Sequence, residues 1–138
     1  MRRLAAWLCV VLLAGCAGTE KADLERYVHV DLKQIDGYER KLDDDAGGPH
    51  EMAHLCQAYV QALEQLRPAT RAVRELHALK LKAARTRLAA LNDFETALKH
   101  GDRSLGNRAR DRFALARQQR KAYDARLAEL EEADGVRP

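Results

Sequence analysis

The sequence is poor in residues that break helices and in residues that act as nucleophiles. Its 138 residues include three prolines, eight glycines and three cysteines, 5% of the residues are aromatic, and Ser104 is the one serine. The chain has no glycine-rich phosphate loop, no CxxCH haem motif and no GxSxG elbow, so we do not expect a nucleophilic hydrolase. Its clearest apolar run, residues 4–13, is about half as long as the roughly 20 residues that a membrane-spanning helix requires.

The sequence also lacks runs of alternating apolar and polar residues bounded by turns, so it does not predict β-strands. Apolar residues recur instead at spacings of three, four or seven, which is typical of amphipathic helices. The sequence therefore predicts an all-α domain over residues 16–134, built as an elongated antiparallel bundle of about three helices at about 20–43, 50–99 and 103–133. We expect residues 135–138 to form a frayed tail.

Glycine and proline place the expected helix boundaries. The Gly47-Gly48-Pro49 segment ends the first helix, because paired glycines are costly inside a helix and proline suits the first turn of the next one. Pro68 falls inside the long second helix, but the apolar period continues past it and no capping residue precedes it, so we expect a kink and not a turn. Gly101 and Asp102 then supply a C-terminal cap and an N-terminal cap.

The last predicted helix carries a heptad pattern over three repeats. Phe113, Arg120 and Leu127 occupy one row, and Ala116, Tyr123 and Leu130 occupy the other. Strict seven-residue spacing favours coiled-coil-like packing against the preceding helix, and the short connection makes the two a C-terminal antiparallel hairpin. The same pattern allows a homodimer as an alternative, with a second copy covering the heptad positions.

The start of the chain has the organisation of an export signal. Arg2 and Arg3 precede the apolar residues 4–13, and the segment Leu13-Ala14-Gly15-Cys16 follows. That segment resembles the lipobox of bacterial lipoproteins. The resemblance implies a signal peptide over residues 1–15, cleavage before Cys16, and a diacylglycerol thioether on Cys16 with further fatty acyl chains such as palmitate.

The resemblance also implies an address. Residue 17 is Ala and not Asp, which among lipoproteins of diderm bacteria favours the outer membrane over the inner one, here with the domain on the periplasmic face. Several acyl chains, at about 0.8 kcal/mol per buried methylene, anchor a protein firmly. We therefore expect a protein bound to the membrane through its lipid, with no other cofactor.

Removal of residues 1–15 would lower the net charge and the number of cysteines. Arg2 and Arg3 leave, so the net charge falls from +3 to +1. A nearly neutral, exported chain with few aromatic residues is not expected to bind nucleic acid. Cys9 leaves too and Cys16 is lipidated, so Cys56 has no partner for an internal disulfide. We expect Cys56 to be a small residue at the edge of a core, with an intermolecular disulfide as the alternative.

Charge is unevenly distributed along the chain. Residues 67–121 hold 15 basic and 5 acidic residues, whereas residues 20–66 hold 5 basic and 11 acidic residues. One interpretation is a basic face that lies opposite an acidic first helix. The other is an anionic partner at the hairpin tip, because guanidinium groups bind phosphate and carboxylate with two hydrogen bonds. The candidate residues are Arg103, Arg108, Arg110 and Arg112. The candidate partners are an envelope protein, peptidoglycan and lipopolysaccharide.

The segment His50-Glu51-Met52-Ala53-His54 resembles the HExxH signature of zincin metalloproteases, in which two histidines bind zinc and the glutamate is the general base. Three features favour a coincidence: the helix starts beside His50, both histidines lie away from its apolar stripe, and the strands of zincins are missing. Two histidines four residues apart nevertheless chelate metal ions on an exposed helix, so His50 and His54 are candidate ligands. We expect surface or boundary positions for the other histidines, His29, His77 and His100.

These features predict two classes of function. The first is a membrane-anchored envelope lipoprotein that acts, without enzymatic activity, as a helical interaction or spacer module. The alternative is a periplasmic metal-binding or stress-responsive helical protein that uses His50 and His54. That alternative is similar in outline to the small helical-hook metal sensors of the periplasm, although the LTxxQ-type repeats that those proteins often carry do not occur here.

Overall fold

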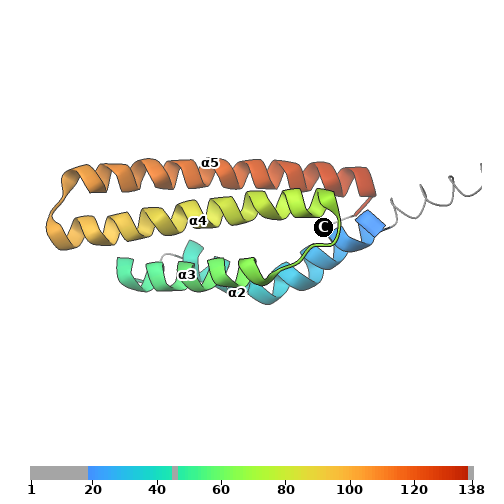
Figure 1. The fold of residues 1–138 in the computed structure, drawn as a ribbon, viewed down its shortest axis with the longest axis horizontal. Helices are drawn as coiled ribbons and strands as arrows, with labels where there is room; N and C mark the ends of the chain where they lie inside the picture. The colour runs from blue at the N-terminus through green and yellow to red at the C-terminus, as the bar shows by residue number, and fades with distance from the viewer. Residues whose placement is uncertain (1–18, 45–46, 137–138) are drawn as a thin grey trace, which may run out of the picture.

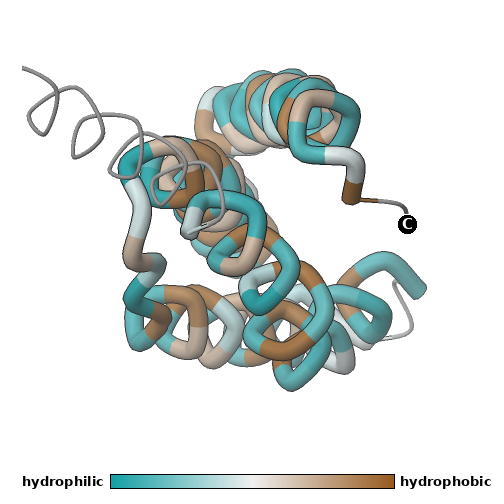
Figure 2. The backbone as a smooth tube through the Cα atoms, turned by 90° about the vertical axis from the view of Figure 1, so that its right-hand side faces the viewer, coloured by the Kyte–Doolittle hydropathy of each residue, from teal (hydrophilic) through white to brown (hydrophobic). Residues whose placement is uncertain are grey.

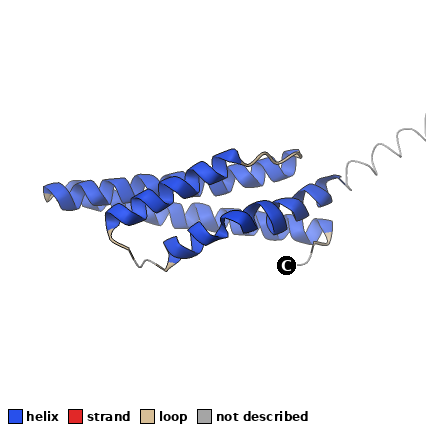
Figure 3. Cartoon of the chain, turned by 90° about the horizontal axis from the view of Figure 1, so that it is seen from below, coloured by secondary structure: helices blue, strands red, loops and turns tan. Residues whose placement is uncertain are grey.

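The computed structural model describes residues 19–44 and 47–136 of the chain. Within these residues every regular element is helical and none is a strand, which confirms the all-α class (Figure 3). Residues 19–26 are helical and continue into the π-helical turn η1 (Tyr27–Asp31) and then α2 (Leu32–Asp43). The remaining helices are α3 (Pro49–Gln65), α4 (Arg71–His100) and α5 (Arg103–Asp134). The predicted signal peptide and Cys16 lie outside the described residues.

The prediction of one long helix kinked at Pro68 is wrong. α3 ends at Gln65, and Leu66 and Thr70 have extended backbones, with ψ angles of 142° and 158°. Proline has no N–H to donate, its ring clashes with the carbonyl four residues earlier, and it disfavours helix at the preceding residue. The chain therefore reverses between α3 and α4 (Figure 1). The described residues form α2, α3, α4 and α5, one long helix more than the three expected.

The helices run alternately up and down the long axis of the molecule. α2 packs on α3, α3 on α4, and α4 on α5. The two ends of the described chain lie at one end of the bundle, and the turn between α4 and α5 lies at the other (Figure 1). At about 1.5 Å per residue α4 is about 45 Å long, and the α4–α5 hairpin extends past the start of α3 (Figure 1).

Two apolar cores occupy different levels of the bundle, and each helix alternates apolar and polar residues around its circumference (Figure 2). The central core joins α2, α3 and α4; its largest buried members include Leu42, Tyr59, Leu63 and Leu91. The terminal core joins the N-terminal helix to the start of α4 and the end of α5; it contains Leu24, Tyr27, Val73, Leu76, Tyr123, Leu130 and Val136.

The π-helical turn allows one N-terminal helix to serve both cores. The Leu32 N–H bonds to the Tyr27 carbonyl five residues earlier, which places one extra residue in that turn. Tyr27 before the turn is buried in the terminal core, whereas Ile35 and Leu42 after it are buried in the central core. Val136 is also buried in the terminal core, so the expectation of a frayed tail fails at this residue.

The heptad pattern of α5 is confirmed for one row and modified for the other. Ala116, Tyr123 and Leu130 are buried, and Ala109 extends the same seven-residue series toward the tip. The alanines allow α4 and α5 to approach closely along the hairpin. In the second row Arg120 forms ion pairs with α2. This row therefore borders the space between the α2–α3 pair and the α4–α5 pair. None of the described helices is long and apolar enough to cross a membrane.

Candidate functional site

The hairpin tip is closed by the two caps that the sequence predicts. Gly101 has a φ of +66°, a left-handed conformation that glycine adopts without strain, and it ends α4. The side chain of Asp102 accepts a hydrogen bond from the Leu105 N–H at 3.0 Å and so begins α5. The tip is therefore a defined turn that fixes how the flanking side chains project.

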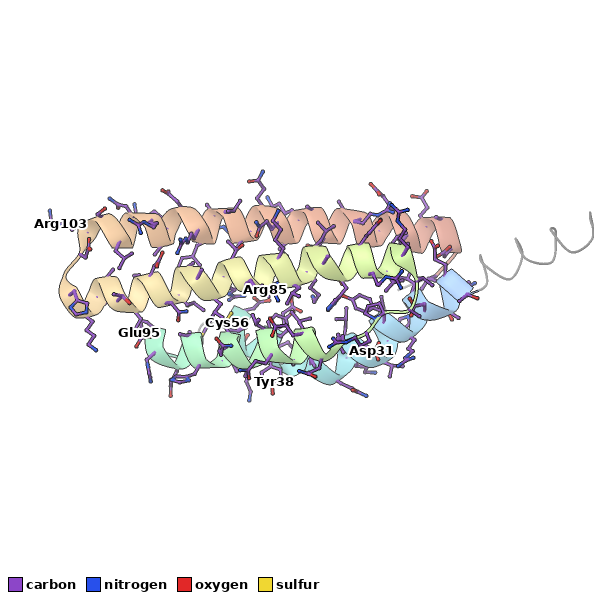
Figure 4. All side chains as sticks on the ribbon, viewed as in Figure 1. Asp31, Tyr38, Cys56, Arg85, Glu95 and Arg103 are labelled. Carbon is purple, nitrogen blue, oxygen red and sulfur yellow. The ribbon has the colours of Figure 1, made fainter. Side chains whose placement is uncertain are left out.

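Three of the four candidate tip arginines are free to bind a partner. Arg103, Arg108 and Arg110 are exposed, and among the described residues none of them forms an ion pair or a hydrogen bond. Arg103 projects from the very end of the hairpin (Figure 4). Arg112 differs, because its guanidinium pairs with Asp93 on α4. We call Arg103, Arg108 and Arg110 the basic tip. Leu98, near the end of α4, is 60% exposed and adds an apolar side chain at this end of the hairpin.

The two histidines of the HExxH segment lie together on the outside of α3. Their ring centroids are 4.5 Å apart in an edge-to-face arrangement. His50 Nδ1 lies 2.8 Å from Glu95 Oε1 of α4, near the start of α3 (Figure 4). A carboxylate on one ring nitrogen fixes the tautomer and leaves the other nitrogen available to a metal ion. Among the described residues no group of three or more His, Cys, Asp or Glu side chains is placed to hold a metal ion.

The expectation for His77 is wrong, because this residue is buried in the bundle. Its Nδ1 lies 3.1 Å from the Tyr27 hydroxyl, and the two rings meet edge to face. Burial lowers the pKa of His77 below its usual 6.5, and the charges of Arg67 and Lys80 act in the same direction. His77 is thus a neutral structural residue at physiological pH.

Glu39 of α2 contacts one side chain from each of α3, α4 and α5. Its carboxylate accepts a hydrogen bond from the Tyr59 hydroxyl of α3 at 3.2 Å and pairs with Lys80 of α4 at 3.1 Å. It also pairs with Arg120 of α5 at 3.1 Å. We call Glu39, Tyr59, Lys80 and Arg120 the Glu39 cluster. These contacts agree with the first interpretation of the charge distribution, in which acidic residues of the first helix lie opposite basic residues of the hairpin.

Asp43 and Tyr123 extend the Glu39 cluster at both ends. Asp43 pairs with Arg87 at 2.9 Å and with Arg120 at 3.1 Å. Burial alone would raise the pKa of Asp43, but its hydrogen bonds and charge interactions with both arginines outweigh burial and lower that pKa. The Lys80 ammonium lies 4.5 Å from the centre of the Tyr123 ring. Burial raises the pKa of both Tyr59 and Tyr123, so both phenols stay protonated.

A cavity of about 650 Å³ adjoins the Glu39 cluster and is partly open to solvent. All four helices contribute to its wall, and its size is within the range of small-molecule sites, roughly 300–1,000 Å³. Its charged lining residues are Glu39, Asp43, Lys80, Arg87, Arg117 and Arg120. Its main apolar lining residues are Leu42, Met52, Leu91, Phe94, Phe113 and Ala116.

Asp23 fastens the N-terminal helix to the start of α4. Its carboxylate accepts hydrogen bonds from the Ala69 N–H at 3.1 Å and from the Thr70 N–H at 2.8 Å. The Thr70 hydroxyl donates a third bond at 2.7 Å. Thr70 makes no side-chain cap of its own, so Asp23 provides the negative charge that a helix N-terminus favours.

Cys56 is fully buried between α3 and α4, where its Sγ lies 3.7 Å from the Ala84 carbonyl oxygen. Burial raises the pKa of its thiol to about 11. It lies inside the central core and not at its edge. An intermolecular disulfide would require this part of the bundle to open, so the structure favours an unreactive packing role.

The sequence did not reveal the Glu39 cluster or the role of Asp23. Arg120 in an otherwise apolar heptad row was the one local signal, because a charge at such a position needs a partner. Asp23 gave no signal, since its hydrogen-bond donors lie 46 and 47 residues further along the chain.

Comparison with known proteins finds no match to this chain among protein-family models, curated proteins or solved structures.

Proposed function

We propose that the protein is a lipid-anchored lipoprotein of the bacterial envelope that works as a non-enzymatic interaction or spacer module. Its lipid on Cys16 would hold one end of the bundle at the outer membrane. The opposite end would present the basic tip to an anionic envelope component. Phosphate or carboxylate groups of lipopolysaccharide, peptidoglycan or an acidic protein fit the guanidinium groups there.

The observation that carries this proposal is that unpaired arginines lie at the α4–α5 end of the bundle. Arg103, Arg108 and Arg110 have no partner among the described residues, whereas Lys80, Arg87 and Arg120 nearer the middle are paired with acidic residues of α2. The described N-terminus lies at the other end of the bundle (Figure 1). A tether at the N-terminus would therefore leave the α4–α5 turn about 45 Å away, the length of α4, and the unpaired arginines within about 10 Å of that turn along α5.

A photo-crosslinking amino acid placed at Arg103 or at Arg108 in living cells tests the proposal. We expect both positions to give adducts with the same envelope component, identified by mass spectrometry. The double variant Arg103→Glu, Arg108→Glu, with the crosslinker at Arg110, should reduce the adduct more than tenfold. Each lost charge-assisted contact is worth about 1.5–3 kcal/mol.

The matched control places the crosslinker at Arg71, an exposed arginine at the opposite end of α4. It should not capture the same component. Equal capture from Arg71, or capture that survives both charge reversals, would contradict a binding role for the tip.

A second candidate function is binding of a transition-metal ion by His50 and His54. It is favoured by the contact of His50 with Glu95, which leaves Nε2 of His50 available, and by the 4.5 Å separation of the two rings. Imidazole nitrogens suit Zn²⁺, Cu²⁺ and Ni²⁺. A two-histidine site on an exposed face supports metal sensing or storage better than hydrolysis.

Calorimetric titration of the full chain with Cu²⁺ and with Zn²⁺ tests this second candidate. We expect one equivalent to bind, with the affinity lowered at least tenfold in His54→Ala and about tenfold in Glu95→Gln. His29→Ala changes an exposed histidine on another helix and should leave the titration unaltered. Unchanged binding in His54→Ala would eliminate the pair as a metal site.

A further inference from the structure

The cavity beside the Glu39 cluster has a charged half and an apolar half. Along α4 the lining proceeds from Lys80 through Arg87 to Leu91 and Phe94. α5 runs antiparallel and follows the same order, with Arg120 and Arg117 opposite the charged part of α4 and Phe113 opposite the apolar part. From Lys80 to Phe94 the cavity follows α4 for about 21 Å at 1.5 Å per residue. It is therefore long, and its polarity changes from one end to the other.

The charged half has an excess of positive charge. Lys80, Arg87 and Arg120 share the carboxylates of Glu39 and Asp43. Arg117 also lines the cavity and is exposed, and it has no ion-pair or hydrogen-bond partner among the described residues. Four cations therefore face two carboxylates, an excess of two positive charges. Arg117 is the cation among them that has no partner in the described part of the chain, and one negative head group would pair with it.

The apolar half combines buried side chains with aromatic side chains that remain partly exposed to solvent. Met52 and Leu91 are buried at the base of the cavity, whereas Phe94 at its far end is 38% exposed, and Phe113 is half-buried. Apolar surface that remains in contact with water is unfavourable in free energy. A ligand that covers this half with hydrocarbon would recover that free energy.

We propose that this cavity binds a long-chain fatty acid, or a similar amphiphile with one acyl chain and one negative head group. The carboxylate pairs with Arg117 at the charged half, and the acyl chain lies between Leu91, Phe94 and Phe113. One acyl chain fits within the volume of about 650 Å³. The proposal requires neither the basic tip nor the histidine pair.

The test uses the full chain, purified and reconstituted in phosphatidylcholine vesicles. The probe is palmitate with a photoactivatable diazirine in the middle of its acyl chain. After irradiation we expect labelled residues on α4 around Leu91 and Phe94 and on α5 around Phe113. Excess unlabelled palmitate should reduce this labelling at least tenfold, and the methyl ester of the probe should label these residues at least tenfold less.

Two variants separate the head group from the chain. Arg117→Glu should lower labelling of the cavity about fivefold, because repulsion replaces attraction at the free guanidinium. Phe94→Asp places a charge at the apolar end and should lower it about tenfold. Circular dichroism would show that both variants keep their helical content, since both side chains are partly or fully exposed.

The matched control is Lys121→Glu, a charge reversal one turn away from Arg117 on α5, at an exposed residue outside the cavity lining. It should leave labelling of the cavity unchanged. Equal labelling by the methyl ester, labelling that is insensitive to Arg117→Glu, or labels scattered over outer helix surfaces would each overturn the proposal. Neither Arg117 nor Phe94 belongs to the basic tip, so failure of this test is distinguishable from failure of the tip as a docking surface.

Discussion

Replacement of Asp23 by alanine is expected to lower the free energy of unfolding by about 2–3 kcal/mol. Asp23 is only 9% exposed and accepts three hydrogen bonds from Ala69 and Thr70. Hydrogen bonds to a charged group contribute about 1.5–3 kcal/mol, and donors left without a partner in a buried site add to the loss. Urea unfolding followed by circular dichroism measures the change.

The contribution of Asp23 should also depend on pH. Burial alone would raise its pKa, but the hydrogen bonds from Thr70 and Ala69 outweigh burial and hold that pKa below the ordinary 3.8. The unfolded chain therefore binds a proton more readily than the folded chain, and acid favours unfolding. The stabilisation is present above pH 3.8 and is lost as the pH falls through the lower folded pKa.

The control for Asp23 is Asp36→Ala, which removes an exposed pair with Arg40 within one helix. That change should cost about 0.5 kcal/mol or less. If Asp23→Ala is no more destabilising than Asp36→Ala, or if the difference between wild type and Asp23→Ala persists unchanged in acid, the carboxylate does not cap α4 in solution.

Replacement of Glu39 by alanine is the second large effect, with an expected loss of about 3 kcal/mol in the free energy of unfolding. Lys80 is 11% exposed and would keep its charge without the carboxylate that compensates it. The Tyr59 hydroxyl would lose its acceptor as well. Loss of one partner from a buried ion pair costs roughly 3–5 kcal/mol, and the partial exposure of Arg120 reduces this figure.

Glu64→Ala is the matched control for Glu39→Ala, because Glu64 joins α3 to α4 through Arg85 at the surface. We expect it to cost about 0.5 kcal/mol. The loss of stability in Glu39→Gln should lie between the losses in the two alanine variants, since the amide oxygen still accepts a hydrogen bond from Tyr59. High salt should weaken the pair at Glu64 more than the cluster at Glu39. Equal losses for the two alanine variants would refute the central role of Glu39.

Local sequence signals predicted the parts of the fold that local chemistry determines. Gly101, Asp102 and Pro49 bound helices where expected, because left-handed backbone, side-chain caps and a missing N–H act within a few residues. The expected kink at Pro68 does not occur, and the apolar pattern fails to show this for a physical reason. A kinked helix and two antiparallel helices both bury a stripe of the same period, so the apolar pattern continues through either.

The candidate site also has parts that the sequence predicts and parts that it does not. The exposed tip arginines were predictable, since charges beside a tight turn are far from any core. The Glu39 cluster and the cavity depend on how four helices are spaced across the bundle. That spacing follows from packing between residues distant in sequence, such as Glu39 and Arg120, and no spacing rule within one helix reveals it.

The three hydrogen bonds at Asp23 also offer a path for mechanical load. In a chain held at its N-terminus, tension that enters residues 19–26 reaches Asp23 before it reaches α2. Asp23 passes it directly to the base of α4 at Ala69 and Thr70, and the two intervening helices are bypassed. Part of a pull on the N-terminus would therefore reach the hairpin without passing through α2 and α3.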